Sequence, residues 1–250
     1  RASVAQRGLH DTERGRGPVL AAHTAAGRVA ARPVDAGSAT VCGTREGIVV
    51  LIDWKRAMGM VDITGVIHVG AHRAEERPFY LKHGIDKIVW VEADPVSVRW
   101  LRQHVPEPVY EYALCEADGE ERTLYVASNK RMSSSLLKPK AHLARYPHIR
   151  FNKQVTVRTL TLDTLVEREG LAGYNLLWAD VQGAEMLVLR GGKRTLRQMD
   201  ALALEVNFAE MYEGCVLAGE LDAWLARRGF SRELTHDTRK GWGDAFYVRI

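Results

Sequence analysis

Hydrophobic and polar positions follow two alternating patterns from about residue 48 to the end of the chain. Short runs of β-branched and aromatic residues, which are typical of buried strands, alternate with longer segments whose apolar residues recur at helical spacing. The short runs predict strands at residues 63–69, 87–92, 108–114, 122–127, 154–158, 174–180, 201–206, 230–235 and 245–249. The longer segments predict helices at residues 75–83, 94–105, 161–169, 184–189 and 217–228.

This order of elements predicts the architecture of the sheet. Strands that alternate with helices of this length build a parallel sheet with helices on both faces. Only a Gly-rich turn separates the last two strands, so they lack room for a crossover helix and should pair as an antiparallel hairpin. We therefore predict an α/β fold with a mostly parallel, Rossmann-like sheet, helices on both faces and a C-terminal antiparallel hairpin. Residues 154–158 are expected at an edge, and residues 130–150 as a long loop or lid.

The first 47 residues differ from the rest of the chain. They are rich in Arg, Ala, Gly, Thr and Val, contain no Phe, Tyr, Trp or Met, and show no sustained strand or helix period. Segments of this kind bury too little apolar surface to fold alone. Because the sequence also begins at Arg1 rather than Met, we expect residues 1–47 to be a disordered or non-native extension and residues 48–250 to form the functional domain. Residues 48–54 are apolar enough to begin that domain as a strand or a helix.

Composition and charge narrow the class of protein. A hydrophobic content of 46% and a charged content of 26% are ordinary for a globular domain, and the net charge of +4 is too small to indicate general nucleic-acid binding. No apolar run reaches the roughly 18 residues of a membrane span, which predicts a protein outside the membrane. The three cysteines are far apart and lack the spacing of metal ligands, so we expect reduced thiols in a cytoplasmic protein.

Polar side chains at the ends of the predicted strands locate the chemistry. In an open α/β sheet, ligands bind beyond the carboxyl ends of the strands. The first confident strand ends at Gly70, in a turn of small residues that lets backbone N–H groups approach a ligand. The next strand ends at Glu92, 22 residues after Gly70, close to the roughly 20-residue spacing of a carboxylate that binds a ribose diol. Asp180 and Glu205 end two further strands.

The turn after the first strand favours one class of cofactor. The residues after Gly70 do not form G-x-G-x-x-G, so a pyrophosphate could not approach the backbone as it does in nicotinamide-binding proteins. A cofactor without a pyrophosphate is favoured, and S-adenosylmethionine is the common one. Nearby carboxylates would stabilise its sulfonium, and Asp180 and Glu185 can supply them. Two alternatives stay open: an NAD-dependent oxidoreductase on the same sheet, and a non-catalytic α/β ligand-binding module.

Five motifs, taken in order, resemble one protein family. They are Val69-Gly70-Ala71-His72; Trp90-Val91-Glu92-Ala93-Asp94-Pro95; Thr161-Leu162-Asp163-Thr164-Leu165; Asp180-Val181-Gln182-Gly183-Ala184-Glu185, continuing through Leu189-Arg190-Gly191-Gly192; and Leu204-Glu205-Val206-Asn207-Phe208. Together they resemble the FkbM family of S-adenosylmethionine-dependent methyltransferases over about residues 63–250. The positions at which this chain departs from the usual acid, Asn, Gly and Glu of that family are His68, His72, Ala74 and Gln182.

The resemblance implies a class I methyltransferase fold and O-methylation of a hydroxyl on a sugar or another small metabolite. It implies that the turn at Gly70 contacts the methionine part of S-adenosylmethionine, that Glu92 binds the ribose, and that residues 113–114 flank the adenine. The full set of implied cofactor residues is Gly70, Ala71, His72, Glu75, Glu92, Ala93, Asp94, Ala113, Leu114 and Asp180.

A hydroxyl acceptor gains from a general base within hydrogen-bond reach, because it must lose its proton as the methyl group arrives. The candidates are Asp180, at the amino group or the transferred methyl group, Glu205, on the substrate side, and His236. Two carboxylates at strand ends can also hold a divalent metal, but this pair alone does not define a site, so no metal is assigned. The basic segment 130–150 is expected as a solvated loop or a lid over an anionic or sugar-like acceptor. We expect a small-molecule or glycan acceptor and no nucleic-acid partner.

Overall fold

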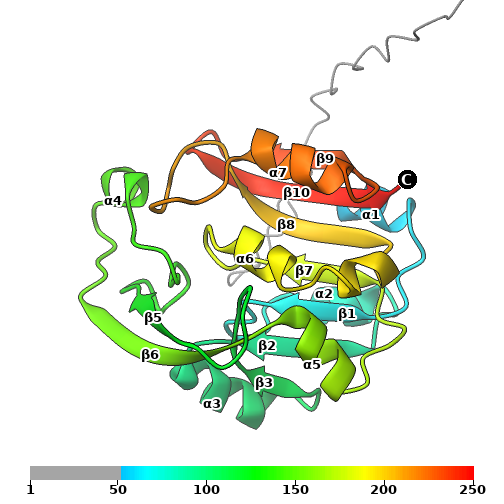
Figure 1. The fold of residues 1–250 in the computed structure, drawn as a ribbon, viewed down its shortest axis with the longest axis horizontal. Helices are drawn as coiled ribbons and strands as arrows, with labels where there is room; N and C mark the ends of the chain where they lie inside the picture. Colours follow the sequence, from blue (N-terminus) through cyan, green and yellow to red (C-terminus); the bar gives the residue numbers. More distant parts are fainter. Residues whose placement is uncertain (1–51) are drawn as a thin grey trace, which may run out of the picture. The chain divides into compact units, whose positions relative to one another are not determined.

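The structure, a computed structural model, describes residues 52–250 of the chain, and the predicted domain boundary at residue 48 lies outside them. Its largest element is a seven-stranded sheet in the order β3-β2-β1-β7-β8-β10-β9 (Figure 1). The strands of this sheet are β1 (Val66–Val69), β2 (Ile88–Glu92), β3 (Val109–Glu111), β7 (Leu176–Ala179), β8 (Ala201–Asn207), β9 (Phe230–Asp237) and β10 (Trp242–Arg249). The helices are α1 (Trp54–Met58), α2 (Arg77–Lys82), α3 (Pro95–His104), α4 (Ala141–Arg145), α5 (Leu162–Arg168), α6 (Glu185–Arg190), α7 (Ala218–Ala226) and the 3₁₀ turn η1 (Thr195–Gln198).

Neighbouring strands from β3 to β8 run parallel, whereas β10 is antiparallel to both of its neighbours, β8 and β9. The antiparallel pairing follows from the short connection between β9 and β10, which leaves no room for a crossover helix. The predicted α/β fold, with a mostly parallel, Rossmann-like sheet and a C-terminal antiparallel hairpin, is therefore confirmed. Because β10 lies between β8 and β9, the last strand of the chain is not the last strand of the sheet.

Alternate residues of the central strands enter two hydrophobic cores, one on each face of the sheet, because successive side chains point to opposite faces. One core joins Leu177 and Leu202 to helices α5, α6 and α7. The other joins Leu176 and Ala201 to helices α1, α2 and α3. Helices on both faces bury the central strands from both sides, which explains their near-continuous apolar sequences.

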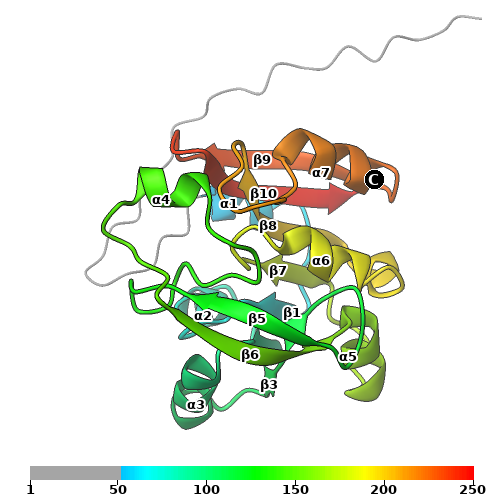
Figure 2. The same cartoon turned by 60° about the vertical axis from the view of Figure 1, so that its left-hand side comes forward.

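A second, three-stranded sheet departs from the prediction. It consists of β4 (Ala113–Leu114), β6 (Lys153–Leu160) and β5 (Glu121–Val126) in the order β4-β6-β5. Figure 2 shows β5 and β6 side by side. The apolar run predicted as one strand at 108–114 is two strands, because the chain leaves the central sheet after Glu111 and pairs with β6 from Ala113. The strand expected at an edge at 154–158 is longer than predicted: residues 154–158 pair with β5 alone, as an edge segment does, but β6 continues through Thr159 and Leu160, which pair with β4.

The segment predicted as a loop or lid at 130–150 contains one short helix, α4. It is tied to the segment that follows β8, because the N–H groups of Lys140 and His142 donate to the carbonyl oxygen of Met211 at 2.8 and 3.1 Å. These main-chain hydrogen bonds hold α4 beside the loop after β8, a loop that also carries Tyr212.

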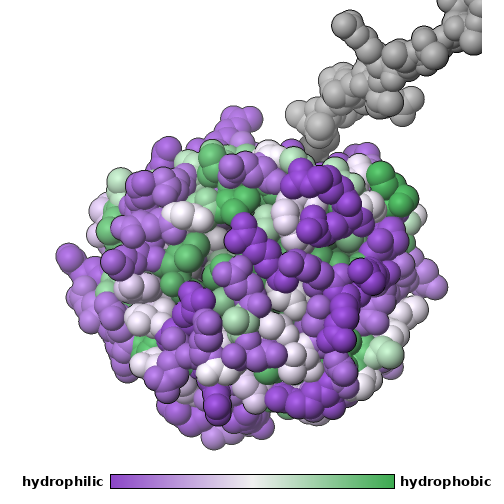
Figure 3. All heavy atoms as spheres, in the orientation of Figure 1, coloured by the Kyte–Doolittle hydropathy of each residue, from purple (hydrophilic) through white to green (hydrophobic). Residues whose placement is uncertain are grey.

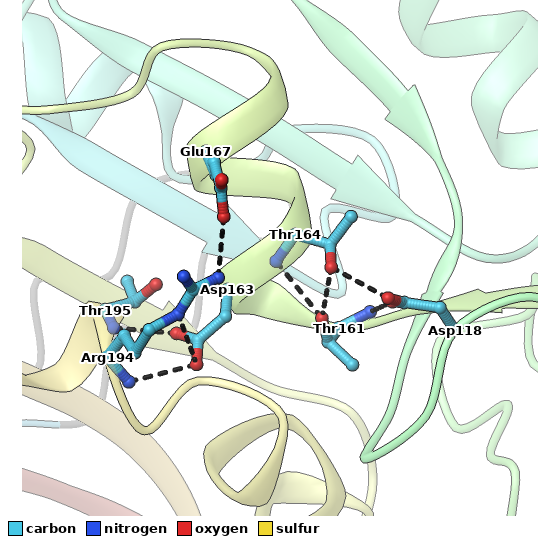
Figure 4. A network of polar contacts seen from close by, with 7 residues as sticks. All are labelled: Asp118, Thr161, Asp163, Thr164, Glu167, Arg194 and Thr195. Carbon is cyan, nitrogen blue, oxygen red and sulfur yellow. Dashed lines mark hydrogen bonds and ion pairs between the residues drawn. The ribbon is translucent and has the colours of Figure 1, made fainter.

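The Thr-Leu-Asp-Thr-Leu motif has a structural role at the start of α5 (Figure 4). Thr161 caps this helix, because its Oγ1 accepts a hydrogen bond from the N–H of Thr164 at 3.1 Å. Asp163 accepts hydrogen bonds from the N–H groups of Arg194 and Thr195, at 3.0 and 2.7 Å. The carboxylate of α5 therefore supplies acceptors to the start of η1, and the motif fixes the chain after α6 against α5.

Hydrophilic residues cover most of the face in Figure 3, and the apolar residues between them form small patches. The exposed large apolar side chains of the described residues are Leu81, Val96, Met132, Leu143, Phe208, Leu217 and Ile250. Single exposed apolar residues are ordinary on a protein surface. Among the described residues, no helix combines the length and apolar character that crossing a membrane requires.

Candidate cofactor and active site

The turn after β1 brings the chain close to the end of β7. Gly70 has a φ of 82°, and a Cβ atom there would lie 1.8 Å from the carbonyl oxygen of Asp180. A glycine is therefore required where this turn closes on β7. His72 and Ala74 also have positive φ values, of 43° and 53°, which non-glycine residues rarely adopt. Such strained residues cluster at functional sites, where the surrounding structure holds them.

Glu92 ends β2 with both carboxylate oxygens already held. Oε2 accepts a hydrogen bond from the N–H of His72 at 2.7 Å, and Oε1 accepts one from the N–H of Asp94 at 2.7 Å. The carboxylate is therefore fixed between the β1 turn and the start of α3, while each oxygen keeps a lone pair for a further donor. Burial raises the pKa of Glu92 above its usual range, although the two N–H groups favour the charged form.

The imidazole of His72 lies between two acceptors. Nδ1 is 2.7 Å from the Glu75 carboxylate, and Nε2 is 2.8 Å from the carbonyl oxygen of Lys130. Both ring nitrogens need a hydrogen to satisfy these contacts, so the geometry favours the imidazolium. Burial opposes the charge, but Glu75 and the Lys130 carbonyl outweigh it, and the pKa of His72 is raised above its usual value. A positive charge is therefore held at the β1 turn.

A cavity lies beyond the carboxyl ends of the strands, between the β1 turn, the end of β2, the start of β4 and the segment after β7. The predicted cofactor residues that line it are Gly70, His72, Glu92, Ala93, Ala113, Leu114 and Asp180. Ala71 is buried beneath this lining, and Glu75 contacts His72 instead. Asp94 caps α3, because its Oδ2 accepts a hydrogen bond from the N–H of Ser97 at 2.9 Å.

Residues 130–136, which we call the strap, close one side of this cavity, and Arg131, Met132, Ser134, Ser135 and Leu136 line it. Three contacts hold the strap. The guanidinium of Arg131 pairs with Asp94, and the imidazole of His72 reaches the carbonyl oxygen of Lys130. The hydroxyl of Ser135 donates to the carbonyl oxygen of Gln182 at 2.7 Å. The strap therefore joins the start of α3 to the segment after β7, and its role as a lid stays a prediction.

Gln182, which is not among the predicted catalytic residues, joins two that are, Asp180 and Glu205. β7 and β8 are parallel neighbours, so Asp180, just after β7, and Glu205, near the end of β8, lie at the same edge of the sheet. The amide nitrogen of Gln182 donates to Asp180 Oδ1 at 2.7 Å and to Glu205 Oε2 at 2.6 Å. Asp180 and Gln182 line the cofactor cavity, whereas Glu205 lies behind them. Gln182 thereby links the cavity to the buried carboxylate.

Burial and nearby charges affect the pKa values of Asp180 and Glu205 differently. The pKa of Glu205 lies well above its usual range, because burial and the charges of Asp180 and Glu185 disfavour its charged form. Burial also raises the pKa of Asp180, but hydrogen bonds from Gln182 and Glu205 and the charge of His72 act in the opposite direction. Asp180 is therefore the residue of the pair that ionises first, and Glu205 keeps its proton.

Glu185 completes a cluster of three carboxylates. Its Oε1 accepts hydrogen bonds from the N–H groups of Val181 and Gly183, at 3.0 and 3.1 Å. Carboxylate oxygens of Asp180, Glu185 and Glu205 lie within 4.8 Å of one another, a spacing that a divalent metal could bridge. However, the Gln182 amide nitrogen bonds to two of the three carboxylates, and a metal would have to displace it. The assignment of no metal stays a prediction.

His68 and Glu76 lie on the α1 and α2 side of the sheet. His68 is buried, its ring stacks on Trp178 at a centroid distance of 5.2 Å, and its Nδ1 is 2.9 Å from the Tyr80 hydroxyl. Burial lowers the pKa of His68 to about 3, so the imidazole is neutral. Glu76 lines a second, smaller cavity with Asp180 and Glu205, and burial raises its pKa to about 8. This second cavity is acidic.

These shifts predict that the free energy of unfolding falls by about 3 kcal/mol between pH 6.5 and 8. Glu76 and Glu185 have folded pKa values of about 8 against an ordinary 4.5, so each keeps a proton in the folded state that it releases on unfolding. Each can therefore remove up to about 1.4 kcal/mol per pH unit in this window. The raised pKa of His72 acts in the same direction, whereas His68 offsets about 0.4 kcal/mol, because it is still half protonated in the unfolded state at pH 6.5 and neutral in the folded state.

Urea unfolding at several pH values, followed by tryptophan fluorescence, measures this slope. Glu76→Gln and Glu185→Gln should each flatten it, whereas Glu111→Gln, at an exposed position on β3, should leave it unchanged. A free energy of unfolding that stays constant across the window would contradict the assignment of protons to the buried carboxyls.

The structure thus brings most, but not all, predicted catalytic residues together. His236 lies on the outer strand β9 opposite Asp244 and does not line the cofactor cavity. Sequence reasoning singled out neither Arg131 of the strap nor Tyr212. Gln182 was identified only as a departure from the family pattern, which was the one signal that pointed to it. Tyr212 offered no signal, because its contacts are with residues far away along the chain.

Comparisons with known families and proteins identify relatives of this chain. The family model described as the methyltransferase FkbM domain matches residues 68–232. The 2-O-methyltransferase NoeI of Sinorhizobium fredii (strain NBRC 101917 / NGR234) is 41% identical over 83 residues. That match covers 33% of this chain and 34% of NoeI, so the chain matches about a third of this curated relative.

Solved structures resemble the chain more distantly. A TehB-like S-adenosylmethionine-dependent methyltransferase from Corynebacterium glutamicum is 10% identical, with a TM-score of 0.41 over 78% of this chain and 86% of that one. Magnesium protoporphyrin IX methyltransferase from Synechocystis PCC 6803, with bound S-adenosylmethionine, is 13% identical, with a TM-score of 0.43 over 79% and 75%. At these values the likenesses carry no inference about chemistry.

Proposed function

This chain belongs to the FkbM family of methyltransferases, and we propose that it transfers the methyl group of S-adenosylmethionine to a hydroxyl oxygen of a sugar or another small metabolite. Family membership confirms the predicted methyltransferase class and, with it, S-adenosylmethionine as the methyl donor. The observation that carries the proposed reaction is the position of Asp180. Its carboxylate lines the cofactor cavity and is held there by the Gln182 amide.

The chemistry of the cavity fits this donor. Glu92 offers two oxygens with free lone pairs, which suit the two hydroxyls of a ribose. The apolar side chains of Leu114, Leu124 and Met132 suit the face of an adenine. Asp180 supplies negative charge for the cationic end of the donor, and the Gly70 turn lets backbone approach it. When bound, the donor supplies a methyl group already activated by positive sulfur.

The residues of this chain then have three tasks in an in-line displacement. The β1 turn and Glu92 hold the donor in place. Holding the two reactants in the reactive geometry supplies most of the rate advantage. Asp180 accepts the proton of the acceptor hydroxyl, since of the pair Asp180 and Glu205 it is the carboxylate that lines the cavity and ionises first. The strap limits the access of water to the same cavity. Glu205 acts on Asp180 through Gln182, and we assign His236 no part.

The acceptor atom is supported by one relative. The curated relative is named a 2-O-methyltransferase, which favours a hydroxyl oxygen as the acceptor in this chain. A sugar or a small polyol offers such hydroxyls to a carboxylate base. We place the reaction in the cytoplasm, where the buried cysteines Cys115 and Cys215 would stay free thiols.

Mass spectrometry after incubation with S-adenosylmethionine and a panel of sugars and polyols tests the proposal. We expect the gain of one methyl group on a hydroxyl compound, together with release of S-adenosylhomocysteine. Calorimetry with S-adenosylmethionine and with NAD tests the alternatives. Tight binding of NAD without binding of the methyl donor would favour the oxidoreductase, and no binding of either would favour a non-catalytic module.

A further inference from the structure

A buried tyrosine lies against Gln182 on the side away from the two carboxylates. Tyr212 is 1% exposed, and its hydroxyl is 2.9 Å from Gln182 Oε1 and 3.1 Å from the carbonyl oxygen of Ser133. It comes from the loop after β8, thirty residues further along the chain than Gln182. No motif of the sequence includes Tyr212, and it has no role in the proposed reaction.

The Gln182 amide can donate to both carboxylates in only one of its two orientations. Its two N–H groups donate to Asp180 and Glu205, so both amide hydrogens are used. A flipped amide would place its oxygen against two carboxylate oxygens, which is repulsive unless both carry protons. Because the two ends of an amide are almost equal in size, packing alone does not choose between these orientations. A hydrogen-bond donor that faces Gln182 Oε1 also favours the observed orientation.

Tyr212 is that donor. Its single hydroxyl hydrogen has two acceptors within reach, and the shorter contact is to Gln182 Oε1, at 2.9 Å against 3.1 Å to the carbonyl oxygen of Ser133. Burial raises the pKa of Tyr212 well above its usual value, so the hydroxyl keeps its proton. A carbonyl-like oxygen buried without a donor costs as much as a lost hydrogen bond. Without this hydroxyl, Gln182 Oε1 would therefore be buried without this donor, and the orientation that serves Asp180 would depend on the two carboxylate hydrogen bonds alone.

The turn beside Gln182 is shaped to admit the tyrosine ring. Gly183 has a φ of 91°, and a Cβ atom there would lie 2.9 Å from Tyr212 Cδ2 and 3.1 Å from Cys215 Cβ. Any larger residue would push the ring away from Gln182. The glycine of this motif therefore serves the contact between Tyr212 and the amide.

We propose that Tyr212 is a positioning residue: it fixes the Gln182 amide, and through the amide it holds the Asp180 carboxylate toward the cofactor cavity. We call Tyr212, Gln182, Asp180 and Glu205 together the amide clamp. The proposal rests on the proposed function in one respect, since it takes Asp180 as the group that meets the acceptor hydroxyl. The other titratable groups that face the clamp are His72, Glu76, Glu185 and Asp244.

Tyr212→Phe removes only the hydroxyl and is the central test. Tyr247→Phe is its matched control, because Tyr247 is equally buried and donates to a side chain, Asp222 Oδ1 at 2.8 Å, outside the clamp. We expect Tyr212→Phe to lower kcat about 30-fold while the KM for S-adenosylmethionine stays within about twofold. Tyr247→Phe should leave both values near those of the wild type.

A spectroscopic measurement tests the clamp without any acceptor. In protein labelled with nitrogen-15 glutamine, the side-chain amide resonances of Gln182 are assigned by their loss in Gln182→Leu. We expect these resonances to shift in Tyr212→Phe and to stay in place in Tyr247→Phe. Unshifted resonances in folded Tyr212→Phe would overturn the proposal, whatever the turnover.

The remaining outcomes separate this proposal from the proposed function. If the wild type methylates nothing while the Gln182 resonances shift in Tyr212→Phe, the proposed function fails and the amide clamp stands. If kcat falls equally in both tyrosine variants, Tyr212 is only structural. Should Tyr212→Phe fail to fold, Gln182→Leu removes the amide that Tyr212 contacts. Wild-type kcat in Gln182→Leu would overturn the proposal, and a loss of about 30-fold would support it.

Discussion

Glu92→Gln is expected to weaken the binding of S-adenosylmethionine by on the order of 100-fold or more. In the wild type, both oxygens of Glu92 accept backbone N–H groups, from His72 and Asp94, each at 2.7 Å. The new amide nitrogen would face one of these N–H groups, so a buried donor would lose its acceptor. Unlike the carboxylate oxygen that it replaces, this nitrogen could not accept a hydrogen bond from a ribose hydroxyl. Hydrogen bonds to a charged group contribute about 1.5–3 kcal/mol each, and about 1.4 kcal/mol corresponds to tenfold in affinity.

Isothermal titration calorimetry with S-adenosylmethionine measures this loss. Glu111→Gln is the matched control, because Glu111 ends the neighbouring strand β3 directly opposite Glu92 but does not line the cavity. It should bind the donor like the wild type. Glu205→Ala should weaken binding far less than Glu92→Ala, and equal losses in these two variants would show that the ribose has been placed wrongly.

Asp180→Asn is expected to lower kcat by about a thousandfold, and to weaken donor binding to a smaller extent because the negative charge facing the cationic end of the donor is lost. Asparagine has nearly the same shape and keeps an oxygen that can accept a hydrogen bond from Gln182 Nε2, which lies 2.7 Å from Asp180 Oδ1 in the wild type. It cannot take a proton from the acceptor hydroxyl. The variant therefore removes the proposed base without removing the hydrogen bond that orients the side chain.

Initial rates at saturating donor and acceptor, followed by S-adenosylhomocysteine release, measure kcat for this variant. Glu205→Gln is the comparison, since Glu205 lies behind Gln182 and does not line the cofactor cavity. We expect it to lower kcat by about tenfold or less. If Glu205→Gln abolished turnover and Asp180→Asn did not, the general base would be Glu205 rather than Asp180.

Glu92 shows how far local sequence signals reach. The apolar run before it predicts a buried strand, and its spacing from Gly70 predicts a carboxylate beside the β1 turn. Both features depend on residues close together in the sequence, and the structure places Glu92 within hydrogen-bond distance of that turn. The strands and the terminal hairpin were predictable for the same reason, because strand periodicity and connection length are local properties.

The second sheet shows where such signals fail. The apolar run at 108–114 continues across Tyr112, so its pattern does not show that the chain changes partners from β2 to β6 there. Residues 154–158 pair on one side only, with β5, as expected of an edge segment, but the strand runs on through Thr159 and Leu160, which pair with β4. The sequence did not show that second pairing, because strand pairing is decided by tertiary packing rather than by period.

By itself, the sequence determined the elements, the mostly parallel sheet with its antiparallel end, the family, and the positions of Gly70, Glu92 and Asp180 at strand ends. These follow from hydrophobic periodicity and from the geometry of parallel strands. Only the tertiary structure decided that Gln182 joins Asp180 to Glu205, and that Tyr212 orients this amide. Those contacts form between loops that the packed sheet brings together, and no spacing along a chain specifies them.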